Sequence, residues 1–190
     1  MATPDDLTAV RAELHMLLAE RAFRFGDFVL TSGRRSDFYF NGKEVTLEGR
    51  GLYLVSRLVL ERCRTLHVDA IGGLTLGADP IVAGVAALSG AGRPVRAFIV
   101  RKQAKGHGTG SLIEGPALRP GDRVMVVDDV ITTGGSLLQA YDALEGLGVD
   151  VIEALALVDR EEGGRQAIEA RGLCVHSLFQ RSQFSAPTPA

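Results

Sequence analysis

The 190-residue chain contains no tryptophan and only two cysteines, Cys63 and Cys174. Two scattered cysteines are too few for a disulfide framework or a zinc site, so both are expected to be reduced core residues of a cytoplasmic protein. The chain also lacks an apolar run of about 18 residues and a signal-peptide pattern. The sequence therefore offers no candidate membrane segment.

An excess of charge of either sign is also missing. The chain has 21 Lys and Arg residues against 23 Asp and Glu residues, a formal net charge of −2. This balance predicts neither a nucleic-acid-binding face nor adsorption to a membrane surface. Affinity for an anionic ligand must therefore come from local clusters of cations.

Apolar runs alternate with segments of helical periodicity along most of the chain. The runs predict five buried strands, at residues 69–73, 95–100, 124–127, 151–158 and 173–179. With 46% hydrophobic residues, a chain of this length is expected to form one globular domain over residues 1–190. The alternation predicts an α/β fold, in which helices flank a doubly wound, mainly parallel sheet of about five strands.

The first part of the chain, residues 1–45, is expected to lie outside this sheet. A helix should start near Pro4 and extend to about Phe25, followed by a hairpin over residues 28–41. The aromatic residues of this hairpin are Phe38, Tyr39 and Phe40. They suit the covering of a planar ring, although a simple exposed turn beside core aromatics is the alternative.

The core is expected over residues 46–179. Thr46 is the predicted N-cap of its first helix, which should run to about Arg64. Residues 180–190 are rich in serine, alanine, threonine and proline, so they are expected to form a loose tail.

The most informative stretch is residues 123–136. Asp128 and Asp129 follow the apolar run, at the carboxyl end of a strand, where open α/β sheets bind ligands. A small-residue turn over 132–136 then leads into a helix, and its glycines, hydroxyls and free N–H groups favour an anion. This pattern indicates a phosphate in the turn beside two carboxylates that accept hydrogen bonds or hold a divalent cation through water. A solvated turn with an N-cap is the alternative.

Two further loops follow predicted strands. Residues 101–110 combine three fixed positive charges, a histidine and three glycines, which suits either a solvated loop or a lid that closes over a polyphosphate. Arg160 follows the strand at 151–158, again at the edge where ligands bind, although a salt bridge to the adjoining acids is equally compatible.

Residues 123–136 resemble the signature for 5-phosphoribosyl 1-pyrophosphate (PRPP) of the type I phosphoribosyltransferases. Together with the Ser32-Gly33-Arg34 hairpin, the basic loop and Asp159-Arg160, they make most of the chain similar to the orotate phosphoribosyltransferases of that family. The resemblance implies a type I phosphoribosyltransferase fold with a small N-terminal hood. It also implies Mg²⁺-dependent transfer of the phosphoribosyl group of PRPP to orotate in pyrimidine (UMP) biosynthesis, giving orotidine 5′-monophosphate and pyrophosphate.

The resemblance further implies which residues contact each substrate. PRPP would be bound by Arg101, Lys102, Lys105, His107, Asp128, Asp129, Val130, Ile131, Thr132, Thr133, Gly134, Gly135 and Ser136. The catalytic residues among them would be Lys102, Lys105, His107, Asp128 and Asp129. Orotate would be bound by Phe38, Tyr39, Thr132 and Arg160. No residue is assigned to Mg²⁺, which would be held mainly through PRPP and water, and a homodimer would share the basic loop between its subunits.

The chain departs from the family pattern at two places. Thr31 stands where many members have a lysine, and Thr75-Leu76 stands where some have Tyr-Lys, so contacts at those positions are not transferred. Two rival functions are a phosphoribosyltransferase for a purine base and a regulator that binds PRPP or nucleotides without catalysis. The basic loop and the absence of a basic face argue against the regulator.

Overall fold

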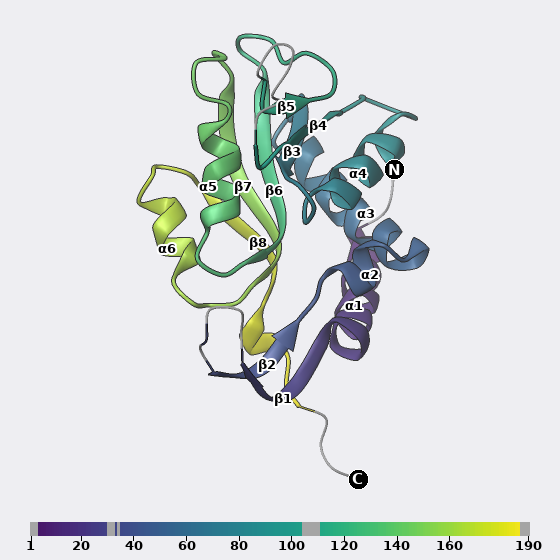
Figure 1. Cartoon of the computed structure of the whole chain (residues 1–190). Helices are drawn as coiled ribbons and strands as arrows, with labels where there is room; N and C mark the ends of the chain where they lie inside the picture. Colours follow the sequence, from purple (N-terminus) through teal and green to yellow (C-terminus); the bar gives the residue numbers. More distant parts are fainter. Residues whose placement is uncertain (1–3, 30–32, 34, 104–110, 187–190) are drawn as a thin grey trace.

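The protein folds around a central parallel sheet (Figure 1). The computed structural model describes residues 4–29, 33, 35–103 and 111–186. Within these residues the sheet has six strands in the order β5-β4-β3-β6-β7-β8. The strands are β3 (Ala70–Leu74), β4 (Arg96–Val100), β5 (Ile113–Glu114), β6 (Arg123–Ile131), β7 (Asp150–Asp159) and β8 (Val175–Gln180). Five strands are parallel, as predicted, and the short β5, which the sequence did not reveal, runs antiparallel to β4.

Helices cover both faces of this sheet (Figure 1). They are α3 (Gly49–Thr65) and α4 (Asp79–Ser89) on one face, and α5 (Gly135–Asp142) and α6 (Gly164–Glu169) on the other. Met125 and Val127 of β6 belong to the core on the α3 side, whereas Val124 and Val126 belong to the core on the α5 side. Successive strand residues point to opposite faces, so these two cores bury both faces of β6. Burial on both faces explains the unbroken apolar run of this strand.

The N-terminal residues form a separate unit, here called the hood. It contains α1 (Pro4–Leu17), the π-helical turn η1 (Leu18–Ala22), and the antiparallel strands β1 (Phe23–Val29) and β2 (Arg35–Phe40). The predicted hairpin outside the main sheet is confirmed. The predicted helix is too long, because Phe25 lies in β1 opposite Phe38, and such cross-strand aromatic pairs stabilise a hairpin.

A short helix, α2 (Lys43–Thr46), connects the hood to the core. The predicted capping role of Thr46 is wrong, because Thr46 is buried at the end of α2. Glu48 caps α3 instead, and its carboxylate accepts hydrogen bonds from the N–H groups of Arg50 at 3.1 Å and Gly51 at 2.9 Å. A carboxylate at a helix start also interacts favourably with the helix dipole.

The C-terminal residues are more ordered than the sequence indicated. Gln180 ends β8, and a 3₁₀ turn, η2 (Arg181–Gln183), follows it. The Phe184 ring is buried and stacks on Phe23 at 4.2 Å and on His15 at 4.5 Å. The expected loose tail is therefore wrong for residues 180–184, because one aromatic side chain anchors them to the hood.

The two cysteines differ in their surroundings. Cys63 is buried in the core on the α3 side, as predicted, whereas Cys174 is exposed, and both are free thiols. Burial raises the pKa of the Cys63 thiol to about 12, so this residue stays protonated and unreactive. None of the helices in the described part of the chain is both long and apolar enough to cross a membrane.

Candidate active site

A cavity of about 300 Å³ opens at the carboxyl ends of β3 and β6. These strands are neighbours in the sheet, although β4 lies between them in the chain. Such a point, where the strand order reverses direction, is the usual ligand site of an open α/β sheet. The described lining residues are Lys43, Leu74, Thr75, Leu76, Gly77, Lys102, Asp128, Asp129, Val130, Thr132, Thr133, Gly134, Gly135, Ser136 and Leu137.

The turn between β6 and α5 forms one wall of this cavity. Gly134 adopts a φ of 82°, and a Cβ there would lie 2.8 Å from the Ile168 side chain and 2.9 Å from the Gly164 carbonyl oxygen. Only glycine therefore suits this position. The first N–H groups of α5 have no acceptor within the helix, and Gly135 and Ser136 line the cavity, so these groups can serve as donors for an anion. The hydroxyls of Thr132, Thr133 and Ser136 belong to the same wall.

Two carboxylates form the floor beside this turn. Asp128 and Asp129 are 6% and 3% exposed, and the Asp129 N–H donates a hydrogen bond to Asp128 Oδ1 at 2.9 Å. They lie within β6, which continues to Ile131, and not after its end as the sequence indicated. A Cβ on Gly77 would lie 2.2 Å from Asp128 Oδ1 and 2.6 Å from Asp129 Oδ1. The loop after β3 thus packs closely on the carboxylate pair, and glycine makes that possible.

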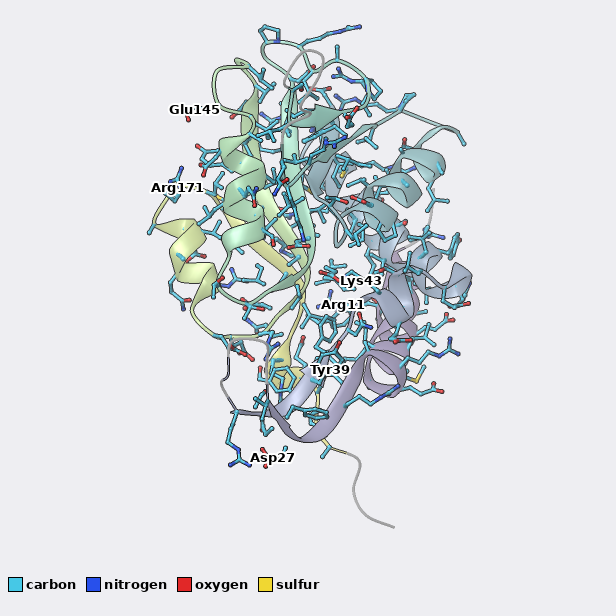
Figure 2. The ribbon with its side chains drawn as sticks, in the orientation of Figure 1. Arg11, Asp27, Tyr39, Lys43, Glu145 and Arg171 are labelled. Carbon is cyan, nitrogen blue, oxygen red and sulfur yellow. The ribbon has the colours of Figure 1, made fainter. Side chains whose placement is uncertain are left out.

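Lys43 brings a positive charge to the same floor. Its Nζ lies 2.8 Å from Asp129 Oδ2, and the two side chains are 38% and 5% exposed. Figure 2 shows Lys43 in the centre of the molecule, between the hood and the sheet. Sequence reasoning did not identify this residue. The available signal was a lysine after Asn41-Gly42 at the end of the hairpin, a pattern too common to single out.

The Asp128 carboxyl has an unusual protonation equilibrium. Burial raises its pKa to about 7, and the adjacent Asp129 carboxylate adds to the increase. Hydrogen bonds from the Asp129 N–H and the Ser136 hydroxyl oppose this increase, because they favour the ionised form. The floor therefore holds the ion pair of Asp129 with Lys43 and, in Asp128, a carboxyl that gains or loses a proton readily near neutral pH.

This protonation predicts a pH-dependent stability. The folded-state pKa of Asp128 lies above its ordinary value of 3.8, so the resulting stabilisation is present below about pH 4 and lost as the pH rises through about 7. The free energy of unfolding should therefore fall with pH relative to that of Asp128→Asn, by an amount on the order of 2–4 kcal/mol. Urea unfolding of both proteins across this range measures the difference. Glu145→Gln, an acid-to-amide change at an exposed side chain, is the control, and parallel profiles for wild type and Asp128→Asn would contradict the expectation.

Arg160 is not among the described lining residues of the cavity. Its N–H donates to the Ile131 carbonyl oxygen at 2.9 Å, which ties it to the end of β6. Its side chain is 9% exposed, and its Nε donates to Glu162 Oε1 at 2.8 Å. Its guanidinium also lies 4.5 Å from the centre of the Phe38 ring. The alternative of a salt bridge is thus realised together with a contact to the hood.

The strand geometry separates the two predicted orotate residues of the hood, Phe38 and Tyr39. Phe38 is buried at 5% exposure, whereas Tyr39 is 45% exposed and contacts Phe28 at 6.0 Å. Neighbouring residues of a strand point to opposite faces. The two rings therefore cannot cover the same side of one ligand.

Other predicted residues fall into three groups. Lys102, Val130 and the 132–136 turn line the cavity with the two aspartates. Arg101 instead pairs with Glu114 of β5 at 3.2 Å, and the Ile131 side chain is buried in the core on the α5 side. The predicted residues Lys105 and His107 lie outside the described residues, as do Thr31 and Arg34.

The chain is similar to known proteins over nearly its whole length. Residues 48–175 match the family described as "Phosphoribosyl transferase domain". The orotate phosphoribosyltransferase of Thermosynechococcus vestitus is 52% identical over 183 residues, which cover 96% of each chain. The chain belongs to the orotate phosphoribosyltransferase family.

Solved orotate phosphoribosyltransferases share its fold. The Mycobacterium tuberculosis enzyme in complex with Fe(III) dicitrate is 40% identical with a TM-score of 0.81, covering 93% of this chain and 99% of that one. A structure of the same enzyme in complex with PRPP is 37% identical with a TM-score of 0.76, covering 91% and 97%. These similarities confirm the predicted type I phosphoribosyltransferase fold and its mainly parallel sheet.

Proposed function

We propose that this chain transfers the 5-phosphoribosyl group of PRPP to orotate, giving orotidine 5′-monophosphate and pyrophosphate in pyrimidine biosynthesis. The observation that carries the proposal is one cavity in which two buried aspartates adjoin a glycine-rich turn at a helix start. The turn suits the 5′-phosphate, which residues 132–136 would hold through N–H groups and hydroxyls. Asp128 and Asp129 suit the ribose hydroxyls, from which a carboxylate accepts hydrogen bonds.

The reaction exchanges one bond at the anomeric carbon of the ribose. A ring nitrogen of orotate loses its proton to solvent and forms a bond to this carbon while the bond to pyrophosphate breaks, and the electron pair of that bond leaves with pyrophosphate. Positive charge grows on the ribose and negative charge on the departing oxygens, so groups that match these charges accelerate the step. Asp129, with its ion pair to Lys43, suits the ribose, and Lys102, another lining residue of the cavity, suits the pyrophosphate.

Mg²⁺ fits this arrangement as an ion that arrives with PRPP. In the described part of the chain, no three or more His, Cys, Asp or Glu side chains gather as a metal site. The cavity presents two carboxylates, of which Asp129 already pairs with Lys43. Mg²⁺ commonly binds through one or two carboxylates together with substrate phosphates and water. When bound, it would neutralise the charge that develops on pyrophosphate.

Orotate is an anion, so an arginine is a suitable recognition group. Arg160, which its backbone hydrogen bond ties to Ile131 at the end of β6, supplies this group, and Thr132, the next residue after Ile131, lines the cavity. Phe38 would contribute to orotate binding indirectly, through its contact with the Arg160 guanidinium.

An assay of substrate preference tests the proposal. Purified protein, PRPP and Mg²⁺ are incubated with orotate, hypoxanthine or adenine, and pyrophosphate release is measured. Release with orotate alone is the expected result. Turnover of a purine base with none of orotate would favour the first rival function, and PRPP binding without turnover of any base would favour the regulator.

The basic loop provides a second prediction. Lys105→Ala and His107→Ala are each expected to lower kcat about 30-fold, because a cation and a proton donor near the departing pyrophosphate stabilise it as the bond breaks. Steady-state rates at saturating PRPP and orotate measure the effect. Folding should be unchanged by circular dichroism, and wild-type rates for both variants would remove the lid from the mechanism.

The assembly and compartment proposed for this chain are a homodimer in the cytoplasm. Both cysteines are free thiols, which suits the reducing conditions of that compartment. A shared basic loop requires two subunits, so sedimentation of the purified protein at twice the mass of the 20.2 kDa chain is the expected result.

A further inference from the structure

Two arginines from different parts of the chain contact the Phe38 ring. The guanidinium carbons of Arg160 and Arg181 each lie 4.5 Å from the ring centre. The ring is buried, and the two arginine side chains are 9% and 21% exposed. A planar guanidinium packs favourably on an aromatic face. The orotate arginine of the proposed function is thus linked through one ring to the C-terminal segment.

Arg181 is held against the hood by several contacts. Its Nη1 donates to the Phe184 carbonyl oxygen at 2.8 Å, and its guanidinium lies 5.2 Å from the centre of the Phe25 ring. Its Nε is buried and finds no hydrogen-bond partner among the described residues. Its Nη2 lies 3.5 Å from Asp37 Oδ2 of β2, so the aromatic rings and this ion pair together hold the guanidinium against the hood. Figure 1 shows η2, which contains Arg181, beside β2 of the hood.

The same segment also holds the turn that carries Arg160. The Ser182 N–H donates to Glu161 Oε2 at 2.7 Å, and its hydroxyl donates to Glu161 Oε1 at 3.1 Å. Glu161 adopts a φ of 61°, a conformation that residues other than glycine seldom adopt without support. Its own N–H donates to Asp159 Oδ1 at 2.9 Å. Residues 181–184 therefore connect the Arg160 turn to the hood.

Arg160 retains donor capacity in this arrangement. Its Nη2 is buried and makes no hydrogen bond with any described residue, although it lies 2.8 Å from Glu162 Oε1. A carboxylate is bound best by two parallel guanidinium donors, so the orientation of the guanidinium plane determines the strength of binding. The contact with the Phe38 ring and the hydrogen bond to Glu162 restrict that plane, and Arg181 contacts the same ring.

We propose that Arg181 is a positioning residue for orotate recognition, an inference that rests on the proposed function. The segment 181–184 clamps the hood onto the Arg160 turn and sets the plane of the Arg160 guanidinium. PRPP binds at the β3–β6 cavity, whose described lining contains neither arginine. Arg181 therefore acts on the binding of orotate and leaves the binding of PRPP unaffected.

The test compares the KM values of the two substrates. Arg181→Met retains the apolar stem and removes the guanidinium, and it should raise KM for orotate about tenfold while KM for PRPP changes less than about twofold. Arg181→Lys retains the charge without the planar group, so it should restore only part of the orotate affinity. Steady-state pyrophosphate release, with each substrate varied in turn, gives both constants.

Arg171→Met is the matched control. Arg171 also forms an ion pair, with Asp142 at 2.6 Å, and lies over an aromatic ring, Tyr141, at 5.7 Å. Figure 2 places it beside α6, far from the hood. Its replacement should leave both KM values unchanged.

Three results separate the possibilities. The positioning role would be overturned if Arg181→Met raised both KM values equally, or if its KM values matched those of Arg171→Met. The proposed function would still stand in that case, provided that the wild-type protein turns over orotate. Failure of the wild-type protein to use orotate would instead remove the proposed function. If Arg181→Met does not fold, Ser182→Ala takes its place, because it removes only the hydroxyl contact with Glu161. This variant should raise KM for orotate about twofold to threefold. An unchanged KM for orotate would overturn the proposal.

Discussion

Replacing Asp129 with asparagine is expected to lower kcat/KM for PRPP about 1000-fold. The amide has nearly the shape of the carboxylate but loses its negative charge. This change weakens the hydrogen bonds from the ribose hydroxyls and leaves the Lys43 ammonium, now 2.8 Å from an uncharged group, uncompensated beside the ribose. Positive charge develops on the ribose during the reaction, so an uncompensated cation there raises the barrier. Initial rates at varied PRPP and saturating orotate measure the loss.

Asp142→Asn is the control for this substitution. Like Asp129, Asp142 is an aspartate in an ion pair, here with Arg171, but it lies at the end of α5 and does not line the cavity. Thermal unfolding of both variants distinguishes catalysis from stability. A loss of less than about tenfold in a normally folded Asp129→Asn protein would remove the carboxylate from PRPP binding, and a protein that does not fold would make Asp129 a structural residue.

The parts of the site that the sequence predicted are those built from neighbouring residues. Residues 123–136 contain a buried strand, two carboxylates and a turn whose glycine at position 134 requires a left-handed backbone. All of these are local properties, so a single stretch revealed them. The strand was predicted too short because the buried acids interrupt its apolar run, although β6 pairs with β7 as far as Ile131.

The parts that the sequence did not predict depend on how distant segments dock. The Lys43–Asp129 pair joins residues 86 positions apart, and Arg181 meets Asp37 across 144 positions. Such contacts appear only when the hood is placed on the sheet. The errors at Thr46 and in the tail have the same origin. The Glu48 side chain lies at the start of α3, where it accepts hydrogen bonds from two N–H groups. Phe184 packs against rings from α1 and β1.

The docking of the hood and α2 on the sheet also creates contacts with both proposed substrate sides. Phe38 of β2 contacts Arg160 after β7, and Lys43, shortly after β2, contacts Asp129 in β6. Gly42 allows this approach, because a Cβ there would lie 3.1 Å from the Asp129 Cβ. The hood and the adjoining helix α2 thus touch the proposed orotate side and the proposed ribose side at separate points, so substitutions at Arg181 and Lys43 should affect different substrates.

Lys43→Met is expected to lower kcat/KM for PRPP about 100-fold. Asp129 is 3% exposed, and without the ammonium its charge would be buried beside Asp128 with no compensating cation at 2.8 Å. The carboxylate pair would then hold a proton more tightly, so the acidic limb of the pH profile of kcat/KM should move to higher pH. Lys43→Arg keeps the charge and should retain most of the activity near neutral pH.

A double-mutant cycle decides whether Lys43 acts through Asp129. If it does, Lys43→Met should cost little in a protein that already carries Asp129→Asn, because no carboxylate remains at that position to compensate. Additive losses would mean that Lys43 contacts the substrate independently of Asp129. The pH profile gives a second criterion, because a merely structural lysine would lower the yield of folded protein and leave the acidic limb in place. The combination of a shifted limb and a less than additive double variant would show that Lys43 acts through its ion pair with Asp129.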